Sequence, residues 1–283
     1  MVKKYYKYRP LYKVGVNGTR VPDPFTESVF RKAEIYYCTP EDFNDPFDCN
    51  LRLHADDSTD QQWEEYLDKA FKSKCTVEQL NSFKSQKAWQ TTPGFKRKIG
   101  LTTQRDHYKK SSVFCLSKKA NSIPMFSYYA DSHRGIAIEF SFSDGNIPCG
   151  IHLGDPRNPY DRRVVFSDVD YSQNLPELNY HKLYGTPQLV KSLLFTKYAE
   201  WEHEQEFRIV RRNVSASPVS FDKNLVTMVI FGCKTKDEDF NLVKTWLTGW
   251  PSDVIFSKAE APSNEFSLNI KKFDTIRSQP VRK

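Results

Sequence analysis

Residues 135–142 read Gly-Ile-Ala-Ile-Glu-Phe-Ser-Phe, a short run of β-branched and aromatic residues that is typical of a β-strand. Comparable runs, separated by short turns, predict further strands near 4–12, 35–38, 112–116, 163–171, 206–210, 225–231, 254–256 and 266–270. Helical spacing occurs in separate blocks, at about 27–33, 186–203 and 237–247. Because strands follow strands and do not alternate regularly with helices, the sequence predicts an α+β fold with a largely antiparallel sheet.

The domain organisation is predicted to be simple. With 283 residues, of which 39% are hydrophobic, the chain is able to bury a core, and we expect one α+β domain over residues 1–283. Apolar residues at three- and four-residue steps, among them Trp63, Leu67 and Phe71, predict a helical insertion at about 57–110. Residues 275–283 are predicted to form a frayed basic tail.

The charge is moderate, with a formal net value of +7 and both signs interspersed, as on an ordinary solvated surface. Basic residues gather in two places that are able to meet phosphates and leave a nucleic-acid partner open. The first is the N-terminal stretch of residues 3–13, where lysines and Arg9 alternate with tyrosines; the second comprises Lys96, Arg97 and Lys98 with Lys109 and Lys110 nearby.

The sequence predicts a soluble protein that stays in the cytoplasm and has no contact with a membrane. No apolar run reaches the ~18 residues that a membrane span needs, and Met1-Val2-Lys3-Lys4 is not followed by the apolar core of a signal peptide. The six cysteines are widely spaced without a Cys-x-x-Cys pair, so we expect free thiols and no metal site.

Several common enzyme classes lack their motifs here. Glycine is scarce, at 11 residues, and neither Gly-x-Gly-x-x-Gly nor the P-loop pattern occurs, which argues against a Rossmann dehydrogenase or a P-loop enzyme. The Gly-x-Ser-x-Gly elbow of hydrolases is also absent, and His203-Glu204 lacks the second histidine of a zinc-binding His-Glu-x-x-His helix.

The strongest candidate for chemistry is Glu204-Gln205-Glu206-Phe207-Arg208, where a helical pattern passes into a strand pattern. If Glu204 begins the strand, then Glu204, Glu206 and Arg208 share one face. Repulsion would raise the pKa of one carboxylate while Arg208 keeps the other ionised, as acid/base and oxocarbenium chemistry require. All three are therefore predicted catalytic residues. The alternative is a solvated helix face with an ordinary Glu204–Arg208 ion pair.

Two further segments carry candidate binding residues. Ser127, Tyr129, His133 and Arg134 precede the strand that starts near Gly135, and such a mixture of rings, hydroxyls and an imidazole suits a nucleotide-like ligand. The alternative is a surface loop whose tyrosines cover the core.

Asn44 and Asp45, before Pro46 and Phe47, are the third candidate. They would present polar side chains to a pocket, or merely form a structural turn.

These segments, with two others, resemble in order the blocks of a bacterial family catalogued as domain of unknown function 2971. The matching blocks are Tyr-Lys-Tyr-Arg at 6–9, the Pro-to-Phe turn at 40–47, Phe-Cys-Leu-Ser at 114–117, residues 125–135, and Lys197 with Trp201, Glu204, Glu206 and Arg208. The resemblance spans nearly the whole chain. It departs from the family at Phe126, where tryptophan is common, and in the long helical insertion.

The layout of these blocks is also similar to that of ADP-ribosyltransferases, which implies sheets of that type and NAD as a substrate. By this resemblance Tyr8 or Arg9 would hold the cofactor, Ser127 and Tyr129 would brace it, and Glu204 or Glu206 would be catalytic. The implied function is ADP-ribosyl transfer to a protein or nucleic-acid acceptor, or NAD hydrolysis, as in a toxin or anti-phage effector with a restraining partner protein.

Two alternatives stay open beside that function. One is a nucleic-acid-processing, nuclease-like effector that stacks a strand on the N-terminal Tyr/Lys stretch. The other is a non-catalytic module that binds a nucleotide in the same pocket.

Overall fold

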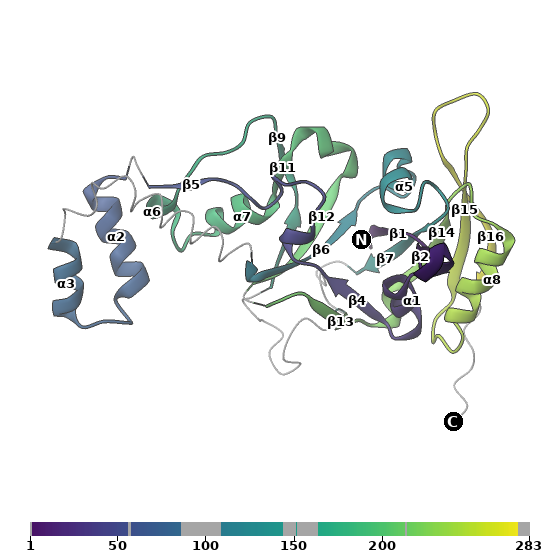
Figure 1. Ribbon diagram of the computed structural model, residues 1–283, viewed down its shortest axis with the longest axis horizontal. Coiled ribbons are helices and arrows are strands. Elements are labelled where there is room, and N and C mark those ends of the chain that lie inside the picture. The colour runs from purple at the N-terminus through teal and green to yellow at the C-terminus, as the bar shows by residue number, and fades with distance from the viewer. Residues whose placement is uncertain are drawn as a thin grey trace.

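The computed structural model describes residues 2–55, 58–85, 109–143, 151, 164–212 and 214–276. Its centre is an eight-stranded sheet in the order β16-β15-β14-β7-β1-β6-β12-β8 (Figure 1). These strands are β16 (Asn269–Ile276), β15 (Val254–Glu260), β14 (Val226–Phe231), β7 (Ile136–Phe142), β1 (Lys3–Arg9), β6 (Ser111–Ser117), β12 (Glu206–Arg212) and β8 (Val164–Asp168). Of the neighbouring pairs, β14 and β15 run parallel and the others antiparallel. The predicted α+β fold with a largely antiparallel sheet is confirmed.

Shorter elements surround this sheet. Four two-stranded sheets pair β2 (Tyr12–Val14) with β3 (Arg20–Pro22), β4 (Glu34–Tyr37) with β13 (Ser217–Ser220), β5 (Leu53–His54) with β10 (Leu178–Asn179), and β9 (Asp170–Ser172) with β11 (Thr196–Tyr198). The helices are α1 (Pro24–Arg31), α2 (Asp60–Phe71), α3 (Val77–Ser85), α5 (Ile123–Tyr129), α6 (Tyr180–Leu183), α7 (Pro187–Phe195) and α8 (Asp237–Trp246). No helix of the described ranges has the length and apolarity that crossing a membrane requires.

The central strand β7 shows how the sequence builds two layers of core. Ile136, Ile138 and Phe140 point to one face, where they join the main core with α1 and α8, while Ala137 points to the other and packs with α5. At the β12 end of that second face, a separate core forms with α2, α6 and α7. The face opposite the main core thus carries two apolar regions, and the candidate site lies between them.

The central sheet opens between β1 and β6. Strand β1 pairs with β7 from Lys3 to Arg9, but with β6 through the single pair Tyr6 and Ser117. Beyond this pair the Lys7 Nζ donates across the gap to the carbonyl oxygen of Cys115 at 3.0 Å. This divergence creates room for a cavity within an otherwise continuous sheet.

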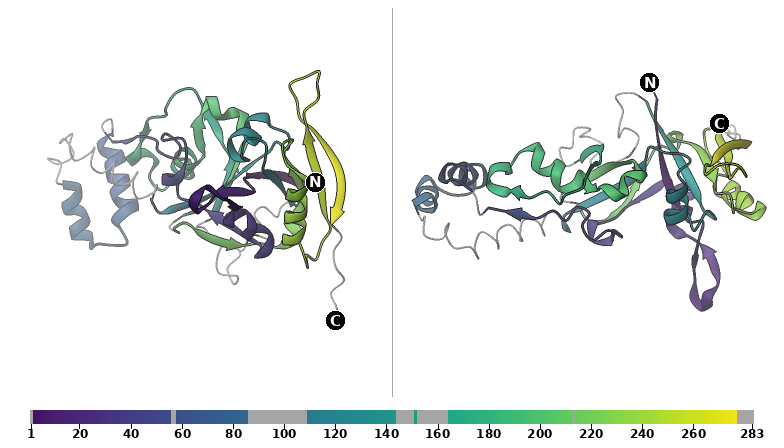
Figure 2. Two further views of the ribbon diagram at one scale, coloured as in Figure 1. Left: turned by 45° about the vertical axis from the view of Figure 1, so that its right-hand side comes forward. Right: turned by 90° about the horizontal axis from the view of Figure 1, so that it is seen from above.

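The helical insertion lies at one end of an elongated molecule, opposite α8, β15 and β16 (Figures 1 and 2). Helices α2 and α3 agree with the prediction over residues 60–85, whereas residues 57 and 86–108 of the predicted insertion lie outside the described residues. Thr275 and Ile276, assigned to the basic tail, instead end strand β16, because their backbones pair with β15. Residues 277–283 of that tail also lie outside the described residues.

The strands predicted over 4–12 and 163–171 are each divided, at residues 10–11 and at Val169. Two further predicted element boundaries are wrong. The helix expected over 186–203 ends at Phe195, since Thr196 turns extended and β11 pairs in parallel with β9. A short 3-10 helix, Ala199–Glu204, follows. The strand expected from Phe266 starts only at Asn269, and Phe266 itself is fully exposed. In both places tertiary pairing overrides local propensity.

Candidate functional site

Three segments that are far apart in the sequence meet through hydrogen bonds. Tyr129, the last residue of α5, donates its hydroxyl to Glu204 Oε1 at 2.6 Å. Asn44, in the turn after β4, donates from Nδ2 to the Tyr129 hydroxyl oxygen at 3.3 Å. The predicted convergence of these three segments is therefore present in the structure, with Tyr129 at its centre.

Glu204 ends the 3-10 helix and does not begin the strand. Gln205 adopts a left-handed conformation, with φ of 44°, and the strand starts at Glu206. Ser117 fixes the turn by donating its hydroxyl to the Glu204 carbonyl oxygen at 2.7 Å. The prediction that Glu204 shares the strand face of Glu206 and Arg208 through strand alternation is wrong, because the reversal at Gln205 breaks that alternation. The Glu204 side chain is nonetheless buried, at 3% exposure.

Lys197, on β11, lies between three carboxylates. Its Nζ donates to Glu204 Oε2 at 2.6 Å and lies 3.5 Å from Asp48 Oδ2 and 3.6 Å from Glu206 Oε2. Burial alone would lower the pKa of Lys197, but Glu206, Asp48 and Glu204 outweigh it and raise that pKa, so the ammonium stays charged. The carboxylates thus face a shared cation instead of the mutual repulsion that the sequence suggested.

Arg208 holds the other side of this group and is itself fully buried. Its guanidinium donates to both Glu206 oxygens at 2.8 Å and to the two Asp48 oxygens at 2.8 and 2.7 Å. Burial would raise the pKa of Glu206, but Arg208 and Lys197 more than offset it and hold that pKa at about 2. Asp48, Lys197, Glu204, Glu206 and Arg208 form one network, called here the ion cluster.

Asp48 is a member of the ion cluster that the sequence did not single out. Cys49, which follows it, has a left-handed φ of 54° and turns the chain so that Asp48 reaches Arg208, which is 160 residues away. The available indication was Arg208 itself, because an arginine in the middle of a buried strand needs carboxylate partners. Sequence spacing does not say which aspartate supplies them.

The ion cluster borders a cavity of about 320 Å³ at the divergence of β1 and β6, called here the carboxylate cavity. Its wall combines carboxylates, cations and aromatic rings, together with polar backbone. The lining residues are Tyr6, Lys7, Tyr8, Arg9, Cys38, Asp42, Phe43, Asn44, Asp48, Cys115, Leu116, Ser117, Met125, Tyr129, Lys197, Glu204 and Glu206. Of the predicted site residues, Tyr8, Arg9, Asn44, Tyr129, Glu204 and Glu206 are among them.

Tyr8 and Arg9 reach the cavity wall, but protein groups already engage their polar atoms. The Tyr8 hydroxyl donates to the Lys119 carbonyl oxygen at 2.7 Å. Arg9 donates to Asp23 at 2.8 Å and to the Thr26 hydroxyl at 3.3 Å. Both residues shape the cavity, and Arg9 adds a positive charge that Asp23 partly offsets.

The other predicted site residues are not part of the described cavity wall. Asp45 accepts from the Phe47 amide at 2.9 Å, as in the structural turn. Ser127 and Arg134 are exposed, and the His133 ring stacks on Phe126 with centroids 5.9 Å apart. Burial and the charge of Lys234 lower the pKa of His133. Arg208 lies behind Glu206 and Asp48, which separates it from the cavity.

Three of the four tyrosine rings in the N-terminal Tyr/Lys stretch are buried, and the fourth, Tyr12, is half-buried and covered by the Arg20 guanidinium. Tyr5, Tyr6 and Tyr8 are buried at 5%, 9% and 4% exposure, and Tyr6 donates to Glu139 at 2.9 Å. Lys4 pairs with the same Glu139 at 3.0 Å. Stacking of a nucleic-acid strand on these three tyrosines, the expected basis of a nuclease-like activity, has no surface to occur on.

Two further predictions concern metals and cysteines. Within the described ranges, no three His, Cys, Asp or Glu side chains are arranged to hold a metal ion. The cysteines described there, at 38, 49, 75, 115 and 233, are free thiols, and Cys149 lies outside those ranges.

Comparison with known proteins returned no match: no family model fits the chain, and no curated protein or solved structure is significantly similar to it. The resemblances to domain of unknown function 2971 and to ADP-ribosyltransferases therefore stay predictions.

Proposed function

We propose that the carboxylate cavity cleaves the bond between ribose and nicotinamide in NAD, and that Glu204 is the catalytic carboxylate. The observation that carries this proposal is the position of Glu204. It is buried at the wall of a cavity and held at both oxygens, by Tyr129 and Lys197, each at 2.6 Å. A carboxylate fixed in this way is suited to stabilise positive charge that develops beside it.

The reaction needs such a charge stabiliser. When the C1′–N bond breaks, its electron pair leaves with nicotinamide, and the ribose carbon becomes an oxocarbenium cation. An acceptor hydroxyl, carboxyl or water then attacks C1′ and releases a proton, which gives an ADP-ribosylated acceptor or free ADP-ribose. An anionic group beside C1′ lowers the barrier because the attraction is stronger in the transition state than in the ground state.

Tyr129 and Lys197 act here as positioning residues. Burial and the neighbouring Glu204 raise the pKa of Tyr129, so its phenol stays protonated and continues to donate to Glu204. The raised pKa of Lys197 likewise keeps the ammonium as a donor. Two fixed donors therefore orient the carboxylate before substrate arrives, and no reorganisation is needed during the reaction.

The size of the cavity suits part of the dinucleotide. A volume of about 320 Å³ is at the lower end of the range for small-molecule pockets, ~300–1,000 Å³. That volume favours the nicotinamide riboside half, with the adenosine half outside. Lys7 and Arg9, half-buried on the same wall, supply positive charge toward the phosphates.

The test is NAD turnover by the purified chain and by Glu204→Gln, with and without protein and nucleic-acid acceptors. Glu202→Gln is the matched control, because Glu202 lies in the same 3-10 helix and is exposed. We expect Glu204→Gln to lower the rate of nicotinamide release by roughly 10²-fold or more, and Glu202→Gln to leave it unchanged. Equal rates in both variants, or unchanged NAD with every acceptor, would count against the proposal.

A further inference from the structure

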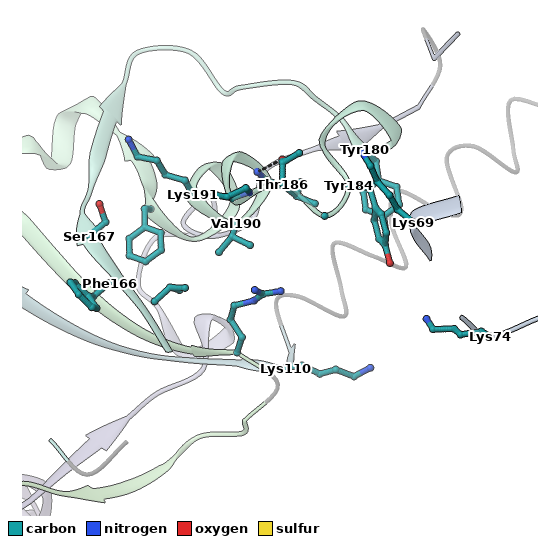
Figure 3. A pocket seen from close by; sticks show the side chains of 16 residues that line it. Lys69, Lys74, Lys110, Phe166, Ser167, Tyr180, Tyr184, Thr186, Val190 and Lys191 are labelled. Carbon is teal, nitrogen blue, oxygen red and sulfur yellow. Dashed lines mark hydrogen bonds between the residues drawn. The ribbon is translucent and has the colours of Figure 1, made fainter. Parts of the chain in front are cut away.

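A second and larger cavity lies between the helical insertion and the edge of the central sheet (Figure 3). It measures about 1070 Å³ and is called here the basic groove. Five cationic side chains line it, Lys69, Lys74, Lys110, Lys191 and Arg212, and its described lining includes no acidic residue. They come from α2 and the turn after it, the residue before β6, α7 and the end of β12. Because they converge from separate parts of the chain, they are unlike a charge run on one solvated helix.

Most of these charges are available to a ligand. Lys69 and Lys74 are exposed, Arg212 is half-buried, and none of the three forms an ion pair with a described residue. Lys191 does pair with Asp170, at 2.8 Å, but its side chain remains half exposed. Three cations that form no ion pair with a described residue, placed in a concave surface, raise the local concentration of polyanions.

The groove also offers aromatic surface. Tyr184, after α6, is half-buried on the groove wall, and its ring packs edge-to-face against Tyr180 with centroids 5.4 Å apart. Phe166 on β8 borders the groove but its ring faces away from it, because Phe166 pairs with Ile209 and packs toward Phe207. A partly exposed ring near cations provides a stacking surface next to sites for phosphates.

We propose that the basic groove binds single-stranded nucleic acid. Cations would contact the phosphates, and Tyr184 would stack on an unpaired base, which a duplex with its bases already stacked does not offer. This site is separate from the carboxylate cavity. Strand β12 runs from Glu206 at that cavity to Arg212 at the groove, and six residues of strand span ~20 Å. Binding in the groove does not depend on the proposed reaction with NAD.

The experiment measures binding of fluorescent RNA and DNA single strands of about 15 nucleotides, and of the matching duplexes, without NAD. The triple variant Lys69→Glu, Lys74→Glu, Arg212→Glu is expected to bind single strands about 10-fold or more weakly than the unaltered chain. The slope of log affinity against log salt should flatten by ~2, since single strands lose ~0.7 per phosphate contact removed. Comparison of the RNA and DNA single strands shows which of the two the groove binds more tightly.

The control triple variant is Lys234→Glu, Lys236→Glu, Lys244→Glu. It makes the same change in charge on exposed lysines around α8, at the other end of the molecule (Figure 1). It should bind single strands like the unaltered chain. Equal weakening in both triple variants would show that the loss of affinity follows the net charge alone, and would overturn the groove as the binding site.

The aromatic contribution is tested by Tyr184→Leu, with Tyr36→Leu as control because Tyr36 is 39% exposed on β4 and does not line the groove. We expect Tyr184→Leu to weaken single-strand binding by about 5-fold or more and to leave duplex binding unchanged. Tighter binding of duplex than of single strand, or displacement of the strand by an acidic polypeptide at lower concentration than by a second strand, would overturn the proposal. Glu204→Gln should bind single strands as tightly as the unaltered chain. Failure of the NAD proposal is therefore distinguishable from failure of the groove proposal.

Discussion

Arg208 shows how a single buried charge organises the candidate site. The desolvation of a guanidinium costs several kcal/mol, and the residue is tolerated because Asp48 and Glu206 each accept two hydrogen bonds from it. Lys197 then connects this pair to Glu204. Five side chains therefore depend on one another for their orientation, and removal of one leaves the others buried with unbalanced charge.

Replacing Arg208 with methionine should destabilise the fold strongly. The change leaves Asp48 and Glu206 without their main partner, and loss of one member of a buried ion pair costs ~3–5 kcal/mol. The control is Arg212→Met on the same strand, where no ion pair with a described residue is lost, and ~0.5 kcal/mol or less is expected. Urea unfolding of both variants measures the difference; similar midpoints would show that Arg208 is not held as described.

Glu206 should make the free energy of unfolding depend on pH in the acid range. Its pKa in the folded chain is about 2, below the ordinary value of 4.5, so the ionised form stabilises the fold at pH above 4.5. This stability is lost as pH falls from about 4.5 to about 2, and amounts to at most ~3 kcal/mol. In Glu206→Gln the free energy of unfolding, measured by urea titration across that window, should change less steeply. Parallel curves for the two proteins would contradict the assignment.

At the level of single residues, the sequence predicted which segments meet at the site better than it predicted which side chains pair there. The sequence did single out Asn44, Tyr129 and Glu204, because these polar and aromatic residues occur in connecting segments that do not require them. Asp48 could not be predicted, since it meets Arg208 across 160 residues, and Lys197 was considered only because its block resembles one of a known family. Long-range ion pairs leave no spacing in the sequence, whereas strand and helix periodicity does.

Among the elements, helix α5 positions Tyr129, its last residue, and the turn that follows holds α5 in place. Asp131, Ser132 and His133 all have positive φ, at 46°, 50° and 71°, so the chain makes a left-handed turn there. Such a turn costs free energy for residues other than glycine and needs support from its surroundings. The support comes from two glycines, Gly135 and Gly232, which pack against backbone.

Enlarging Gly232 should displace this turn. A Cβ at that position would lie 2.2 Å from the His133 carbonyl oxygen, so backbone must move. Gly232→Ala is expected to cost ~1–3 kcal/mol and to shift α5 and Tyr129, lowering NAD turnover as well. Gly15→Ala is the control, because its Cβ would meet only side-chain atoms at 3.1 Å or more. The check is thermal unfolding with turnover on the same samples; a Gly232→Ala protein as stable and active as Gly15→Ala would refute this role for the turn.

Strands were the more predictable elements, because runs such as 135–142 carry their apolar pattern locally. The segment after α7 was not predictable in this way. Its residues 196–204 continue a helical pattern, yet β9 captures Thr196 to Tyr198 as a parallel partner and Gln205 reverses the chain. The site depends on this interruption, since it places Lys197 and Glu204 7 residues apart but in contact at 2.6 Å.

At the scale of the whole molecule, the two proposed sites differ in how they border the cores. The carboxylate cavity has lining residues from all three, whereas the basic groove is closed on one side by α2, which packs with α6 and α7 in the core beside β12. Helices that pack at the periphery of a core are expected to open independently of the protein's centre. Loss of the insertion's packing should therefore affect the groove before it affects the cavity.

The variant Leu67→Ala tests this separation. Leu67 is 2% exposed in the core of α2, and its truncation should cost ~2–5 kcal/mol locally. Hydrogen exchange should then accelerate in α2, α3 and α6, while the amides of β1 and β7 keep their protection and NAD turnover is preserved. Ile138→Ala, in the middle of β7, is the matched truncation in the main core and should accelerate exchange across the central sheet. If Leu67→Ala instead exposed β7 as much as Ile138→Ala does, the insertion and the sheet would unfold as one unit, and the independent opening of the groove would be refuted.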